Sequence, residues 1–93
     1  MKYLPDSVML DTLIKVQELQ STILTAGYSA HLDAGVHENW PDIRETHINF
    51  ELTIFDGTEL IRTFDFNASD SEAVIEATYN LALAYTRFLK ANV

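Results

Sequence analysis

The 93-residue sequence contains no cysteine, only three glycines and two prolines, and no long apolar run. Without cysteine it has neither a disulfide framework nor a thiolate for metal binding or nucleophilic catalysis, a composition that fits a reducing compartment. The N-terminal segment lacks the apolar run of a signal peptide, and no Gly-rich phosphate loop is present. We therefore expect a single domain, residues 1–93, that is soluble and cytoplasmic.

Basic residues are also scarce. Six Lys and Arg stand against fourteen Asp and Glu, which gives a formal net charge of −8 at pH 7. Residues 33–76 hold eleven of these acids and only two arginines, whereas the two ends of the chain are close to neutral. Because phosphate neutralisation by Lys and Arg supplies most of the affinity of nucleic-acid binders, we expect no direct binding to DNA or RNA.

Hydrophobic periodicity predicts an α+β fold of one helix, three strands and a second helix. Apolar residues recur at helical spacing over residues 6–26, and Gly27 follows where a helix would end. Apolar and polar residues alternate over residues 28–37 and 46–54, which indicates two strands. A third strand carries inward-facing Leu60, Phe64 and Phe66. Since each helix and the sheet have one apolar face, both helices are expected on a single face of an antiparallel α-β-β-β-α sheet.

The connection "FDGT" predicts a tight hairpin between the second and third strands. A two-residue Asp-Gly turn would set polar residues opposite the apolar face, because pairing parity decides which faces match. A three-residue loop, Phe55 to Gly57, instead pairs Leu52 with Leu60 and places His47 opposite Asp65.

The last helix is predicted from "SDSE", where Ser69 and Glu72 form a capping box. Its expected core face is Val74, Thr78, Leu81, Ala82, Tyr85, Phe88 and Leu89. Tyr79 and Leu83 fall beside that stripe, as scattered surface residues or as part of a contact with another subunit.

The opposite face of the sheet is left to water in this arrangement. It displays His31, Asp33, His37, His47, Asn49, Glu51, Thr53, Glu59, Ile61, Thr63 and Asp65. His31, His37 and His47 are candidate ligands for zinc or a similar ion. The stretch "HENWPDIRETH" begins like the zinc-protease signature H-E-x-x-H, but Pro41 occupies the second histidine position. Solvated histidines beside acids are the favoured interpretation, and no cofactor and no enzymatic activity are expected.

The segment between the first two strands, "ENWPDIR", is a predicted loop, because Pro41 blocks ladder pairing. Trp40 and Arg44 are typical energetic anchors of protein interfaces, which favours a recognition loop. The alternative is structural: Trp40 and Ile43 cover the end of the core. The sequence leaves both open.

The order of elements is that of the double-stranded-RNA-binding domain, but acids stand where such a domain needs bases. Small, acidic, cysteine-free α-β-β-β-α chains resemble the phage-encoded inhibitors that mimic nucleic acids, among them anti-CRISPR and anti-restriction proteins. Acidic immunity proteins against nuclease toxins are a neighbouring class. The resemblance implies a non-enzymatic inhibitor, and since no motif carries it, it assigns no residue a role.

The leading hypothesis is a protein-binding module that docks on a basic partner, such as a nuclease or another nucleic-acid-binding protein. Its predicted contact residues are Asp33, Glu38, Trp40, Asp42, Arg44, Glu45, Glu51, Glu59 and Asp65. The alternative is a self-associating structural or assembly protein, for example a homodimer formed through the first strand or the Tyr79/Leu83 helix face. A metal-binding protein that uses the histidine-bearing sheet face is the third hypothesis.

Overall fold

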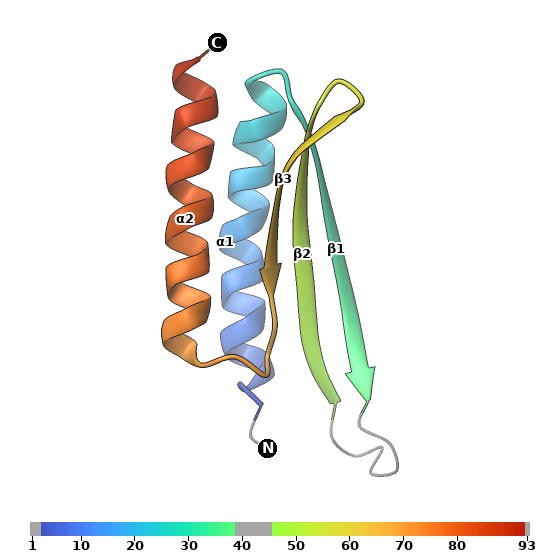
Figure 1. The fold of residues 1–93 in the computed structure, drawn as a ribbon. Coiled ribbons are helices and arrows are strands. Elements are labelled where there is room, and N and C mark those ends of the chain that lie inside the picture. The colour runs from blue at the N-terminus through green and yellow to red at the C-terminus, as the bar shows by residue number, and fades with distance from the viewer. Residues whose placement is uncertain (1–2, 39–45, 93) are drawn as a thin grey trace.

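Two helices lie side by side on one face of a three-stranded antiparallel sheet, in which β2 is the central strand (Figure 1). The computed structural model describes residues 3–38 and 46–92, with the backbone alone at 36–38 and 46. The elements are α1 (Asp6–Thr25), β1 (Ser29–Glu38), β2 (Thr46–Asp56), β3 (Glu59–Phe66) and α2 (Glu72–Ala91). The predicted fold class, the order of elements and the placement of both helices on the sheet are confirmed.

α1 ends at Thr25 with Ala26 as its C-cap, and Gly27 follows the helix end as the sequence predicts. Gly27 has φ +98°, a left-handed conformation that glycine adopts without strain. The N–H of Tyr28 donates to the carbonyl of Ile23 (3.2 Å) and the N–H of Gly27 to that of Leu24 (3.1 Å). This is a Schellman motif, which satisfies the last carbonyls of the helix and turns the chain into β1.

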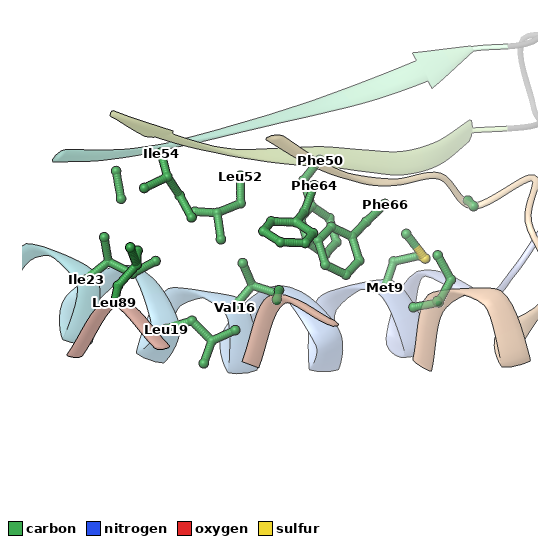
Figure 2. Close-up of a cluster of buried hydrophobic side chains, with 14 residues drawn as sticks. Met9, Val16, Leu19, Ile23, Phe50, Leu52, Ile54, Phe64, Phe66 and Leu89 are labelled. Carbon is green, nitrogen blue, oxygen red and sulfur yellow. The ribbon is translucent and has the colours of Figure 1, made fainter. Parts of the chain in front are cut away.

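The core lies between the helices and the sheet, and Figure 2 shows its side chains converging from both layers. Phe50 and Phe66 stack at its centre, with ring centroids 4.6 Å apart. The buried hydrophobic residues are Met9, Val16, Leu19, Ile23, Ala30, Phe50, Leu52, Ile54, Phe64, Phe66, Ala68, Ile75, Ala82 and Leu89. Among the described side chains of β1, Ala30 belongs to this set and Leu32 packs against it in part, while β2 and β3 supply the large buried residues of the sheet.

The β2–β3 hairpin turns through Gly57 and Thr58, with Asp56 opposite Glu59. Gly57 has φ +63°, as a tight hairpin turn requires. Regular pairing from this turn would set polar and apolar faces against each other. A β-bulge between Ile54 and Phe55 removes the conflict, because Ile61 remains unpaired and the parity is restored beyond it.

The predicted register of this hairpin is therefore wrong. Leu52 pairs with Phe64 instead of Leu60, and Asp65 pairs with Glu51 instead of His47. Leu60 lies before the bulge, so it is exposed instead of buried. Ile61, expected on the solvated face, packs in part against the core.

The start of α2 also differs from the prediction. The helix begins at Glu72, and its N-cap is Ser71, whose Oγ accepts a hydrogen bond from the N–H of Val74 (3.2 Å). The capping box between Ser69 and Glu72 does not form. "SDSE" contains two serines that can cap, and the structure uses the second.

The buried face of α2 is rotated by about one residue from the predicted stripe. Its buried residues are Ile75, Ala82, Thr86 and Leu89. Three residues expected in the core are exposed: Val74 (46%), Leu81 (59%) and Phe88 (60%). Tyr79 and Leu83, expected at the surface, are partly buried against the core, and Lys15 of α1 lies over the Tyr79 ring with its Nζ 5.6 Å from the centroid.

Candidate partner-binding surface

The sheet face opposite the helices carries a row of three carboxylates, which we name the acid row: Asp33, Glu51 and Asp65. The register sets Asp33 of β1 directly opposite Glu51 of β2, and Glu51 directly opposite Asp65 of β3. Side chains at such positions start only about 5 Å apart. Asp33 and Asp65 are exposed and Glu51 is half-buried. The row therefore concentrates negative charge on a line perpendicular to the strands.

His31, Thr53 and Thr63 flank the acid row on one side, and Gly35 and Asn49 flank it on the other. Thr53 follows Glu51 on the same face, and its hydroxyl donates to Glu51 Oε1 (3.0 Å), which fixes this central carboxylate. On the other side, Gly35 lies opposite Asn49 and leaves the face without a side chain. A shallow hollow forms there, and it is lined by Asp33, Ala34, Gly35, Asn49, Phe50, Glu51, Asp65 and Asn67. Asn49 is held in place because its Oδ1 accepts from the N–H of Ala68 (2.7 Å).

The only lysine or arginine of the three strands, Arg62, does not neutralise this face. Arg62 pairs with Ile54, whose side chain is in the core, so it extends toward the helices. Its guanidinium carbon lies 5.2 Å from the ring centroid of Phe64 and 5.6 Å from that of Tyr85. The positive charge is thus held over aromatic rings on the other side of the sheet.

Like charges directly opposite one another on a sheet are destabilising. The acid row places three carboxylates on neighbouring strands, with no lysine or arginine among the nearest residues on the same face. The fold thus retains an arrangement that opposes its own stability, and this is what marks the row as a candidate binding surface.

The structure brings together only part of the predicted contact set. Asp33, Glu51 and Asp65 form the acid row, whereas Glu59 lies at the hairpin end, opposite Asp56. Glu38 pairs with Thr46 at the far end of β1, and its side chain is not among those described. Trp40, Asp42, Arg44 and Glu45 lie outside the described residues. Asp56 is a further acid at this end that was not among the predicted contact residues, because its place beside Glu59 follows from the "DGTE" turn only once the register is known.

His47 departs from its expected place on the solvated face. It is only 7% exposed, and the ring of Tyr3 stacks on it with centroids 3.9 Å apart and an angle of 8° between planes. The N-terminal segment is held there by a hydrogen bond from the N–H of Leu4 to the carbonyl of Ala68 (2.8 Å). The prediction that His47 is exposed is wrong.

The other two histidines do not complete a metal centre within the described part of the chain. His31 is exposed and meets the Phe55 ring edge-on at 5.6 Å. The backbone of His37 lies opposite that of His47. Across residues 3–38 and 46–92, no three His, Cys, Asp or Glu side chains are grouped so that they could hold a metal ion.

Comparisons of the chain with protein-family models, curated proteins and solved structures found no match. In the described ranges, neither helix has the length and apolar character needed to cross a membrane.

Proposed function

We propose that this protein is a non-enzymatic inhibitor or adaptor that docks its acidic sheet face on the basic surface of a nucleic-acid-binding protein, such as a nuclease. The observation that carries the proposal is the acid row, which crosses all three strands. The absence of cysteine fits action in the cytoplasm. The partner supplies the positive charge that the face itself lacks.

The density of charge in the acid row is close to that of a nucleic-acid strand. Neighbouring strands of a sheet lie about 4.8 Å apart, so the three carboxylates of Asp33, Glu51 and Asp65 fall within roughly 10 Å. One strand of duplex DNA presents about one phosphate per 3.4 Å of helix axis, so three phosphates span about 7 Å along the axis. A groove lined by Lys and Arg that accepts a phosphate backbone therefore fits this row. The complementarity gives fast, salt-sensitive association.

Two of the alternative forms have little support among the described residues, whereas self-association through β1, an edge strand of the sheet, stays a prediction. The Tyr79/Leu83 face packs in part against the core, so it is not an open surface for self-association. The metal hypothesis has no ligand group to support it among the described residues.

The test is capture of partners by immobilised protein in a lysate of the source cells, with release by added duplex DNA or RNA. The wild type is compared with Glu51→Lys/Asp65→Lys and with Asp11→Lys/Glu18→Lys, a matched double reversal at exposed positions of α1. We expect a nucleic-acid-binding protein to be captured by the wild type and the α1 variant, to be lost with the sheet variant, and to be released by nucleic acid. Capture that survives the sheet reversal, or that nucleic acid does not compete, contradicts the proposal.

A further inference from the structure

The solvent side of α2 carries an apolar stripe that the fold of one chain does not use. We name it the α2 seam, and it consists of Val74, Ala77, Leu81, Ala84, Phe88 and Ala91, all of which are exposed. The intervals alternate between three and four residues, which is the spacing of the two core positions of a coiled-coil heptad. Single exposed apolar residues are normal. Six successive heptad positions without a polar residue instead form a continuous contact surface.

The seam is distinct from the face that α2 turns to the core. That face consists of Ile75, Ala82, Thr86 and Leu89, which are buried. With about 100° per residue, the centre of the seam lies some 140° around the helix from the centre of the buried face. α2 is also the outer helix of the layer in Figure 1, beside α1 and away from β1. A second helix can therefore approach the seam without disturbing the core.

Side-chain size along the seam alternates in a way that is complementary to itself. Val74, Leu81 and Phe88 occupy one heptad position, and three alanines occupy the other. An antiparallel pair with its two-fold axis between Ala82 and Leu83 sets every large side chain against an alanine. The facing pairs are Val74 with Ala91 of the second copy, Leu81 with its Ala84, and Phe88 with its Ala77. A parallel pair would instead set phenylalanine against phenylalanine and alanine against alanine, which alternates crowding with voids.

The charges of α2 favour the same orientation. Glu72 and Glu76 lie in the first half of the helix and Arg87 and Lys90 in the second, all exposed. An antiparallel pair brings the acidic half of each helix beside the basic half of the other, whereas a parallel pair sets like charges together. Alternation of size sets the facing contacts along the seam. The four charges lie about 90–150° around the helix from the seam centre, so their division between the two halves adds only a longer-range preference for the same antiparallel arrangement.

We propose that two copies of this chain form a two-fold symmetric dimer by antiparallel packing of their α2 seams. Such an interface is the same patch on both copies, so it closes and does not propagate into a fibre. The acid row lies on the opposite face of the sheet and stays open in the dimer. This inference does not depend on the proposed function.

The first test is sedimentation equilibrium of the whole protein over a range of concentrations, compared with Leu81→Lys. A charge at the centre of an apolar interface should weaken dimerisation at least about tenfold, while the circular dichroism of the monomer stays unchanged. Ile14→Lys is the matched control, since Ile14 is an apolar residue of α1 with 57% exposure and lies outside the seam. A wild type that is monomeric up to about 1 mM, where even a weak dimer is populated, or equal weakening by Ile14→Lys, overturns the proposal.

The second test determines the relative orientation of the two α2 helices. Because the chain has no native cysteine, only the introduced cysteines can form a disulfide. A chain carrying Val74→Cys is mixed with one carrying Ala91→Cys and oxidised. The antiparallel seam predicts the mixed disulfide, because two copies of position 74 lie about 25 Å apart along the pair at 1.5 Å per residue. Predominance of the disulfide between two Val74→Cys chains would show a parallel pair and overturn the proposed arrangement.

Discussion

Leu89 and Leu81 are two leucines of the same helix with opposite environments. Leu89 is 3% exposed and belongs to the core, whereas Leu81 lies on the α2 seam. Thr86, one turn before Lys90, is buried on the same side of α2 as Leu89 although it is polar. Its hydroxyl donates to the carbonyl of Ala82 (2.7 Å), so the polar group has a partner inside the core and burial carries little penalty.

Truncation of these leucines should therefore have very different effects on the monomer. Leu89→Ala should lower the free energy of unfolding by about 2–5 kcal/mol, because it opens a cavity in the core. Leu81→Ala should lower it by only about 0.5 kcal/mol, as at other surface positions. Urea denaturation at a protein concentration low enough to keep the chain monomeric measures both. Equal losses at the two positions would show that the buried face of α2 is not the one described.

The sequence predicts that α2 is a helix but not which side it buries. Two apolar stripes overlap on it, one through Leu81 and Phe88 and one through Ile75 and Leu89, and the first is the more hydrophobic. Thr86 makes the second stripe look less apolar in the sequence, because its hydrogen bond to the carbonyl of Ala82 forms only in the folded helix. The choice between the stripes is made by packing against α1 and the sheet, which hydrophobic periodicity does not record.

The β2–β3 hairpin shows how one unpaired residue can govern a whole strand. The turn at Gly57 and Thr58 gives a pairing parity that would face Phe64 and Phe66 away from the core. The bulge at Ile61 changes the parity, so that these two residues face Leu52 and Phe50. The sequence indicates both strands and the turn glycine. It does not reveal the bulge, because Leu60 and Ile61 are both apolar and either could face inward.

Deletion of Ile61 should accordingly be tolerated. The remaining residues can pair without a bulge, with Phe64 still opposite Leu52. The free energy of unfolding should therefore fall only by the contribution of the partly buried Ile61 side chain, about 1–2 kcal/mol. Deletion of Asp65 is the matched control. This deletion moves Phe66 to the outer face and so removes an aromatic ring from the core, which should lower the free energy of unfolding by about 3–5 kcal/mol. Thermal or urea unfolding of the two variants compares them, and greater damage from the Ile61 deletion would contradict the register.

Across the whole molecule, the net charge of −8 acts against the compact state. The acid row is the place where this repulsion is most concentrated among the described strands. Salt should relieve it, because the screening length falls from about 30 Å at 0.01 M to about 10 Å at 0.1 M ionic strength. The stability of the protein is therefore coupled to the ionic strength of the solution.

We expect the free energy of unfolding to rise between about 10 mM and 100 mM NaCl. Glu51→Gln/Asp65→Asn should be more stable than the wild type at low salt, by about 0.2–1 kcal/mol, and less sensitive to salt. Asp11→Asn/Glu18→Gln removes the same charge from α1, three or four residues from Lys15, and should not stabilise. Urea denaturation at both ionic strengths measures all three proteins. If the two variants gain equally, the effect comes from net charge alone.

The sequence predicts the members of the acid row but not the row itself. Period-two alternation places Asp33, Glu51 and Asp65 on one face of the sheet. The predicted and the observed register of the hairpin differ by an even number of residues, so both place these side chains on the same face. Their alignment depends on pairing Glu51 with Asp65, and it is the bulge at Ile61 that produces this pairing. Burial of His47 was equally invisible, since the Tyr3 ring that covers it comes from the other end of the chain.

The parallel course of α1 and α2 gives each protomer a permanent axial dipole. Both helices begin at the same end of the molecule and finish at the end where the β2–β3 hairpin lies (Figure 1). Each has about half a positive charge at its start and half a negative charge at its end, so the two macrodipoles add. Asp56 and Glu59 at the hairpin increase the negative pole. In the proposed dimer, a two-fold axis perpendicular to α2 reverses this direction in the second copy. The axial dipoles of the two copies then cancel, and the proposed basic partner would be oriented by the two acidic faces alone.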